Sequence, residues 1–253
     1  IADTDLRRDD LNNQRPKDIS QQELTAFLEG YPQRYLRLVD PSHVYEHVRR
    51  SKNLKPTEVQ ASLTRTDAAW ELSTIAIDQP GLFANICGVL SYFGMNILRG
   101  QAMANENGIV LDLFQFEDRE DYLRLNTTAG QELIDLLGDV VAGKIDITAK
   151  LEGRKRSKIH KHHREGFKPV IRFNNHYSRR FTVMELVAEN ALGLLHQISQ
   201  SISSQHCDIE LVLISTQGVQ ALDVFHLTTN GKKLSEATQD ALKETLHSTL
   251  IPT

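Results

Sequence analysis

The sequence predicts an α+β protein with two similar β-α-β-β-α-β domains in tandem, preceded by a short helical segment. Two stretches, 70–116 and 181–227, carry the same order of apolar runs, polar turn and late Leu-Asp-x-Phe motif. Strand and helix periodicities alternate in both. A repeat of this length indicates a duplicated domain. The predicted units are an arm with short helices at 1–57, a first domain at 58–152, a basic linker at 153–167 and a second domain at 168–253.

The N-terminal segment divides into a polar arm and short helices. Residues 1–20 are polar and charged without a sustained period, which predicts a mobile arm. Ser20 followed by Glu23 predicts a capping box for a helix that ends before Gly30. Asp40-Pro41 predicts the start of a second helix. These helices are too short to form a core alone, so we expect them to pack on the first repeat.

The first repeat predicts the ferredoxin-like split arrangement. Pro80-Gly81 ends a strand and opens an amphipathic helix, and an Asn-Gly turn joins two later strands. The predicted strands lie at 59–64, 70–77, 96–104, 109–116 and 144–151, and the predicted helices at 82–93 and 121–141, the second with a break near 127–130.

The second repeat predicts the same elements without the closing strand. The predicted strands lie at 169–173, 181–189, 209–215 and 221–228, and the helices at 192–205 and 235–250. The sequence stops at Thr253, which leaves no room for a closing strand. We therefore expect the leading strand 169–173 to occupy the vacant sheet position.

Composition narrows the function classes. A net charge of −4 gives no general reason to expect nucleic acid as a partner. Cys87 lies in an apolar helical run, which predicts a buried thiol and fits a reducing cytoplasm. No apolar run approaches the ~20 residues that a membrane helix needs. Neither a nucleophile elbow, a phosphate loop, a Cys-x-x-Cys nor a His-Glu-x-x-His motif occurs, so the chain itself is expected to be non-catalytic, with no catalytic residues.

The linker is basic and rich in histidine. Residues 154–164 carry six Lys or Arg together with His160, His162 and His163. A metal site would need spaced Cys, Asp or Glu partners, and none are present, so we expect no metal. Phosphate contacts to nucleic acid would need interleaved aromatic residues for base stacking, and these are absent too. The pattern favours a solvated linker.

The turn from the first strand to the first helix is the sharpest local feature. Gly81 permits close approach, and the helix N-terminus attracts a carboxylate. Asp78 would accept a hydrogen bond from an ammonium group, and Asn96 would lie nearby and add an amide. The alternative is that Asp78 only caps the helix. In the second copy, Asn190 occupies the position equivalent to Asp78, and Asp208 occupies the position equivalent to Asn96. The carboxylate and the amide have therefore changed places.

These residues carry a family resemblance. The run Glu71-Leu72 through Asp78-Gln79-Pro80-Gly81-Leu82-Phe83 resembles the opening of an ACT domain. More narrowly, it resembles the tandem ACT region that ends the bifunctional uridylyltransferase/uridylyl-removing enzymes of the PII nitrogen-signalling system. The supporting stretches are Tyr31-Pro32-Gln33-Arg34-Tyr35-Leu36, Asn96-Ile97, 108–114, and Phe173-Asn174-Asn175-x-x-Ser178 before Thr182-Val183-Met184-Glu185.

The resemblance implies an amino-acid sensor, with glutamine as the effector and no cofactor. It implies that a nucleotidyltransferase domain and a His-Asp hydrolase domain precede this region in the parent enzyme, which acts on the PII protein. It leaves open a stand-alone relative, intramolecular or homodimeric ACT pairing, and a scaffold that binds nothing small. The first copy keeps the Asp-x-Pro-Gly turn, which favours it as the sensing copy. The candidate ligand-binding residues are Asp78, Gln79, Pro80, Gly81, Leu82, Phe83 and Asn96, and in the second copy Asn190, Gly193, Leu194 and Asp208.

Overall fold

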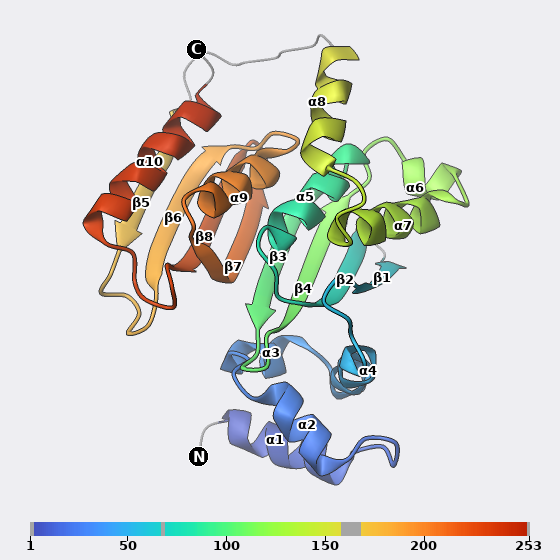
Figure 1. The fold of residues 1–253 in the computed structure, drawn as a ribbon. Helices are drawn as coiled ribbons and strands as arrows, with labels where there is room; N and C mark the ends of the chain where they lie inside the picture. Colours follow the sequence, from blue (N-terminus) through green and yellow to red (C-terminus); the bar gives the residue numbers. More distant parts are fainter. Residues whose placement is uncertain (1–2, 67–68, 158–167, 252–253) are drawn as a thin grey trace.

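The computed structural model describes residues 3–66, 69–157 and 168–251, and these form one antiparallel sheet with helices on both faces (Figure 1). The strand order is β1-β2-β4-β3-β7-β8-β6-β5. The strands are β1 (Val59–Arg65), β2 (Trp70–Ile77), β3 (Asn96–Ala104), β4 (Ile109–Glu117), β5 (Val170–Asn174), β6 (Thr182–Glu189), β7 (Asp208–Gln217) and β8 (Gln220–Thr228). The helices are α1 (Asp3–Asn13), α2 (Gln21–Leu28), α3 (Gln33–Leu38), α4 (Pro41–Ser51), α5 (Leu82–Tyr92), α6 (Tyr122–Leu125), α7 (Ala129–Val141), α8 (Ile147–Ser157), α9 (Leu194–Ser204) and α10 (Glu236–Leu250). The α+β class predicted from the sequence is confirmed.

The two repeats have the same order of elements and meet in the middle of the sheet. In each, a leading strand at the sheet edge pairs with the strand that follows it, β1 with β2 and β5 with β6. The strand 169–173 thus lies at the edge of its half, as expected. The halves join where β3 pairs antiparallel with β7, with Gly100 opposite Ile214. One hydrophobic cluster therefore runs through both repeats.

The strand predicted at 144–151 is wrong, because α8 occupies this stretch. The Asp146 carboxylate accepts hydrogen bonds from the backbone N–H groups of Thr148 (2.8 Å) and Ala149 (3.2 Å), which starts a helix. The sheet position that a closing strand would take is filled by β1. Each repeat therefore reads β-β-α-β-β-α, with its extra strand at the start. The break predicted near 127–130 is confirmed by the gap between α6 and α7.

The mobile arm predicted at 1–20 is also wrong, because this stretch contains α1. Leu11 and Ile19 are buried, and the Tyr45 hydroxyl donates to the Leu11 carbonyl (2.8 Å). The apolar residues of α1 are too few to show a helical period in the sequence. Contacts with α3 and α4 stabilise this helix in the folded protein. The predicted capping box is confirmed, since Ser20 and Glu23 bond each other's backbone N–H groups.

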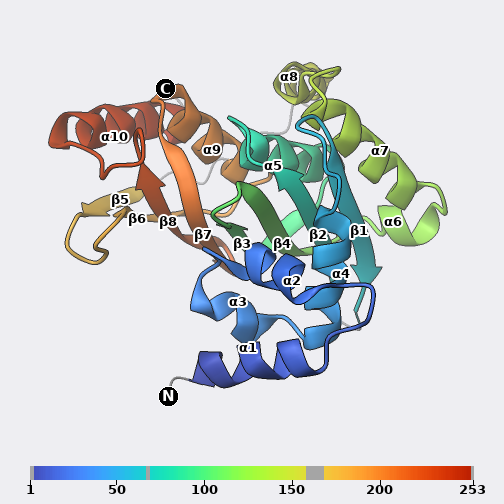
Figure 2. The same ribbon diagram turned by 60° about the horizontal axis from the view of Figure 1, so that its bottom comes forward.

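The N-terminal helices cover the sheet face opposite α5, α7, α9 and α10 (Figure 2). Ile75, Met103 and Leu111 project from this face into a second core with Tyr35 and the other buried side chains of α1 to α4. These helices lie under the first half of the sheet, as expected. No described helix covers the same face of β5, β6 and β8, where Val170 (43% exposed) and Leu222 (36%) remain accessible.

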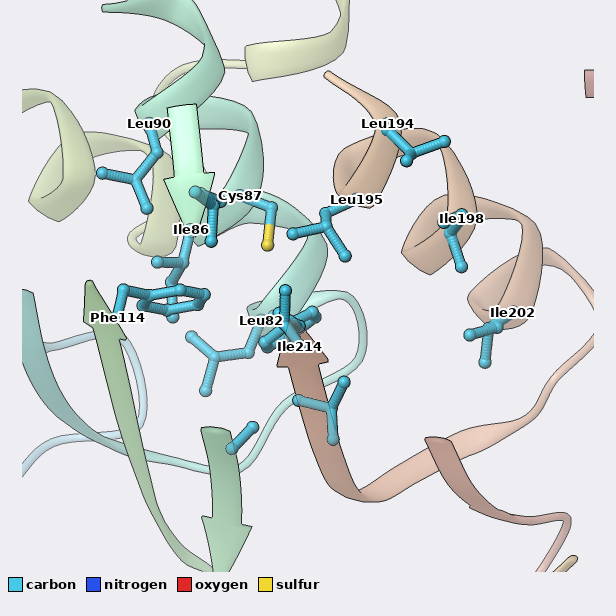
Figure 3. Packing of buried hydrophobic residues seen from close by; sticks show 14 of the residues in the cluster. Leu82, Ile86, Cys87, Leu90, Phe114, Leu194, Leu195, Ile198, Ile202 and Ile214 are labelled. Atoms are coloured by element: carbon cyan, nitrogen blue, oxygen red, sulfur yellow. The ribbon is translucent and has the colours of Figure 1, made fainter. Parts of the chain in front are cut away.

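The helices α5 and α9 pack against each other across the junction of the repeats. Figure 3 shows their apolar side chains in one cluster, with Leu195 turned toward Cys87. His196 on α9 donates from Nδ1 to the Ala84 carbonyl of α5 (2.7 Å). Gly88 leaves room for this contact, because a Cβ there would lie 2.8 Å from His196 Nδ1 and 3.0 Å from Ile147.

Both cysteines are free and buried, as predicted for Cys87. Burial raises the pKa of the Cys87 thiol well above its ordinary value, so this thiol is unreactive at neutral pH. Within the described ranges, none of the helices has the length and apolar character needed to cross a membrane.

Replacing Gly88 with Ala should destabilise the fold by roughly 1–3 kcal/mol, because the methyl group collides with His196 and Ile147 across a packed interface. Gly138→Ala in α7 is the matched control, since a Cβ there meets nothing within 4 Å. It should stabilise the protein by up to about 1 kcal/mol through helix propensity. Urea unfolding followed by circular dichroism measures both, and a stabilised Gly88→Ala variant would contradict the close α5–α9 contact.

Candidate functional site

At the junction of the repeats, the loop before α9 lies near the start of β3, and the loop before α5 lies near the start of β7. Because β3 and β7 run antiparallel, the start of β3 lies beside the end of β7, where Thr216 Oγ1 donates to the Ile97 carbonyl (2.9 Å). The loop of the second repeat reaches the same place, since Asn190 N donates to the Val219 carbonyl in the β7–β8 turn (2.8 Å). Each loop therefore faces the strand start of the other repeat.

At one crossing, which we call the amide crossing, Asn190 meets Asn96. Asn190 Nδ2 donates to Asn96 Oδ1 (3.0 Å), and Asn96 Nδ2 donates to Glu117 Oε2 (3.2 Å). Arg119 Nε donates to the same Glu117 oxygen (3.1 Å). The carboxylate of Glu117 thus fixes the orientation of the Asn96 amide, which in turn orients Asn190.

At the other crossing, which we call the acidic crossing, Asp78 approaches Asp208. Both are at the surface, and both have a raised pKa. For Asp78 the cause is partial desolvation first, then the carboxylates of Asp208 and Glu210, against a smaller lowering by the Gln79 N–H. Like charges at this crossing favour proton uptake or a cationic group.

The predicted approach of Asp78 to Asn96 within the first repeat is wrong. Asp78 follows Ile77, which pairs with Ile109 at the start of β4, whereas Asn96 pairs with Glu117 at its end. Eight strand residues at ~3.3 Å each separate these two positions by roughly 25 Å. The contacts instead run between the repeats. Asn190 of the second repeat meets Asn96 of the first, and Asp78 of the first lies near Asp208 of the second.

Glycine begins both central helices without a side-chain cap. Gly81 (φ 76°) and Gly193 (φ 86°) are the N-cap residues of α5 and α9, in a left-handed conformation that favours glycine. A Cβ at either position would meet open space, so backbone conformation rather than close approach explains the glycines. No side chain caps α5 at Gly81, and the Asp78 carboxylate lies against the Gln79 backbone N–H within the turn.

The remaining predicted site residues have other contacts. Gln79 Nε2 donates to the Val141 carbonyl (3.3 Å), and Pro80 lies exposed in the loop. Leu82 and Phe83 are buried core residues, and the Phe83 ring stacks on Phe114 at 5.6 Å between centroids. Leu194 is buried as well, yet it borders a cavity at the amide crossing.

That cavity lies under the second loop and has a volume of about 20 Å³. Its walls include Asn96, Asn190, Gly193, Leu194, Thr216 and Asp223. A second, larger groove of about 720 Å³ runs between α8 on one side and α9 and α10 on the other. Both spaces share Ser91, Asn96, Asn190, Leu192 and Gly193 as lining residues, so the small cavity borders the groove.

Asp223 and its counterpart Asp112 are the residues that the sequence reasoning missed. Each is only 1% exposed, and burial raises the pKa of each to about 7. Asp112 Oδ2 accepts a hydrogen bond from Thr74 (2.9 Å), the residue opposite it on β2. Leu186 stands opposite Asp223, and no side chain donates a hydrogen bond to either Asp223 oxygen. The Ser215 backbone N–H offsets only part of the burial.

The signal for these aspartates was present in the repeated Leu-Asp-x-Phe motif. An aspartate in an apolar strand, at the same place in both copies, points to a buried carboxylate. The histidines of the linker, His160, His162 and His163, lie outside the described residues. Within the described part of the chain, no group of three or more His, Cys, Asp or Glu side chains could hold a metal ion.

Comparison with known proteins identifies several similar enzymes that share one name. The chain is 28% identical over 260 residues to the bifunctional uridylyltransferase/uridylyl-removing enzyme of Gluconobacter oxydans, covering 97% of this chain and 26% of that enzyme. The enzymes of the same name from Rhodopseudomonas palustris (27% over 219 residues; 81% of this chain, 23% of the enzyme) and Bradyrhizobium diazoefficiens (27% over 239 residues; 88% and 24%) are similar to it too.

The chain thus spans about a quarter of the length of these relatives. No protein-family model matches it. The resemblance to the bifunctional uridylyltransferase/uridylyl-removing enzymes predicted from the sequence is confirmed over most of the chain.

Replacing Asp223 with Asn should make the protein more stable at pH 8 and change it little near pH 4. The folded-state pKa of about 7 exceeds the ordinary value of about 3.9, so the folded state binds the proton more tightly than the unfolded chain does. The destabilisation is complete above pH 7 and is relieved as the pH falls toward 4. We expect a gain of roughly 2–4 kcal/mol at pH 8.

Urea unfolding at both pH values measures this gain. Asp240→Asn, at an exposed position on α10, is the control and should change stability by less than about 0.5 kcal/mol at either pH. An Asp223→Asn variant that is equally destabilised at both pH values would show that the carboxylate is well accommodated in its charged form.

Proposed function

We propose that this chain is the tandem ACT amino-acid-sensing region of a PII uridylyltransferase/uridylyl-removing enzyme, or a stand-alone relative, that acts in nitrogen regulation in the cytoplasm. The effector is a free amino acid, with glutamine as the first candidate. The single observation that carries this proposal is the amide crossing, where Asn190 of one repeat bonds Asn96 of the other beside the N-terminus of α9.

The relatives support the enzyme context. Their name describes two opposed activities, and this chain matches about a quarter of their length. The uridylylation and uridylyl-removal reactions would belong to the remainder of the parent protein, since this sequence contains no phosphate loop, nucleophile elbow or His-Glu-x-x-His motif. The PII protein would then be a partner through the parent enzyme.

The chemistry of the amide crossing suits an amino acid. The uncapped N-terminus of α9 offers backbone N–H groups and a positive dipole end to a carboxylate. Each asparagine amide has an NH2 donor and a carbonyl acceptor. It can therefore donate to the carboxamide oxygen of glutamine or accept from the carboxamide NH2. The adjoining groove of about 720 Å³ has room for the rest of the molecule.

Binding at this place would couple the two repeats. A ligand at the crossing touches a loop of the second repeat and a strand of the first, so it favours arrangements that hold both in place. The difference in affinity between two arrangements is the free energy available for regulation.

The second candidate function is a scaffold that binds nothing small. The uncovered face of β5, β6 and β8, with Val170 and Leu222 accessible, favours an interaction surface of this kind. The pairing of β3 with β7, however, already joins the repeats within one chain and leaves neither strand at a sheet edge for a second copy.

Isothermal titration with L-glutamine tests the proposal. We expect saturable binding, and Asn190→Ala should weaken it at least ten-fold, because about 1.4 kcal/mol of hydrogen bonding is lost. Asp78→Ala is the matched change at the acidic crossing, and retained binding there would assign the effector to the amide crossing. Absence of heat together with unchanged thermal unfolding in millimolar glutamine would favour the scaffold.

A further inference from the structure

Asp223 is a buried carboxylate to which no side chain donates a hydrogen bond, and the nearby Ser215 backbone N–H offsets only part of its burial. Folded proteins pair the large majority of such groups, because an unpaired buried charge is strongly unfavourable. The equivalent Asp112 accepts one such bond, from Thr74 to its Oδ2, whereas its Oδ1 has no partner. Asp223 has the aliphatic side chain of Leu186 at that place instead. The second repeat therefore leaves the Asp223 carboxylate without the side-chain donor that Asp112 has.

Asp223 is one of the residues that line a small cavity. The cavity at Asp223 has a volume of about 20 Å³, close to that needed for one water-sized group. It is too small for a whole amino acid, but an ammonium group fits. The cavity is also lined by Asn190 and Thr216. The Thr216 hydroxyl donates its hydrogen to the Ile97 carbonyl.

We propose that Asp223 is the anchor for the ammonium group of the effector, which enters the small cavity at the amide crossing while the rest of the molecule lies in the adjoining groove. This inference rests on the proposed function. An ammonium group brings three donors and a positive charge, which would satisfy the Asp223 oxygens and compensate their burial. The effector carboxylate would then face the N-terminus of α9 at Gly193.

The inference makes the two crossings unequal. In the first repeat one oxygen of Asp112 accepts a hydrogen bond from Thr74, and the acidic crossing has carboxylates where the amide crossing has asparagines. The second loop, which lost the Asp-x-Pro-Gly turn, is therefore the one assigned to the ligand. This assignment differs from the sequence-based expectation, which favoured the first copy.

Three variants test the anchor by titration with L-glutamine at pH 8. Asp223→Asn removes the charge, and Leu186→Thr offers Asp223 the same hydroxyl that Thr74 gives Asp112, with the carboxylate kept in place. Both should weaken glutamine binding at least ten-fold. Asp112→Asn is the matched control in the first repeat and should stay within two-fold of the wild type.

A second probe isolates the ammonium group. Glutaric acid monoamide is glutamine without its α-ammonium group, and the wild type should bind it at least ten-fold more weakly than glutamine. In Asp223→Asn the two probes should bind within two-fold of each other. Circular dichroism verifies that each variant is folded, and Leu186→Thr decides the question should Asp223→Asn fail to fold.

The outcomes separate the two proposals. Wild-type glutamine binding that Asp223→Asn leaves unchanged, or equal binding of both probes by the wild type, overturns the anchor and leaves the proposed function standing. A wild type that binds neither probe overturns both, and the cavity is then a site for water alone.

Discussion

β3 and β7 pair antiparallel from Arg99 opposite Ser215 to Met103 opposite Leu211, and this pairing merges two repeats into one sheet over one core. Because β3 and β7 are equivalent strands that pair antiparallel, the strands of the second repeat run in the opposite direction to the equivalent strands of the first. The loop before α9 consequently lies at the start of β3, and the loop before α5 at the start of β7. The composition of both crossings depends on this one ladder of backbone hydrogen bonds.

Local sequence was enough to predict the elements that local interactions determine. The Ser20–Glu23 capping box, the helices after Gly81 and Gly193, and the Asn-Gly hairpin all lie where their turn chemistry places them. Strand-like alternation at 144–151 was misleading, because Asp146 caps a helix there and β1 takes the sheet edge. The α1 arm was missed because its order comes from contacts with distant helices.

The composition of the candidate site could not be predicted in the same way. Whether Asn96 meets Asp78 or Asn190 is decided by strand pairing between residues more than a hundred positions apart, which no local pattern encodes. The sequence also shows Thr74 in the first repeat and Leu186 at the equivalent position of the second. The consequence of this difference depends on strand register, which places Thr74 opposite Asp112 and Leu186 opposite Asp223. A buried carboxylate without a side-chain donor weakens the fold above pH 7, and such a weakness is typical of a functional position rather than of a packing position.

The contacts around α9 show how occupancy of the amide crossing would be felt elsewhere. The N-terminus of α9 borders the cavity, and one turn later His196 bonds the Ala84 carbonyl of α5. Thr148 of α8 accepts a hydrogen bond from Gln200 on the same face of α9 (2.7 Å). A ligand that draws the start of α9 toward β3 therefore has to strain or shift α5 and α8 together, since all three helices are tied at neighbouring points. The last turns of α8 also fall within the stretch 153–167 that the sequence predicts as the linker between the repeats.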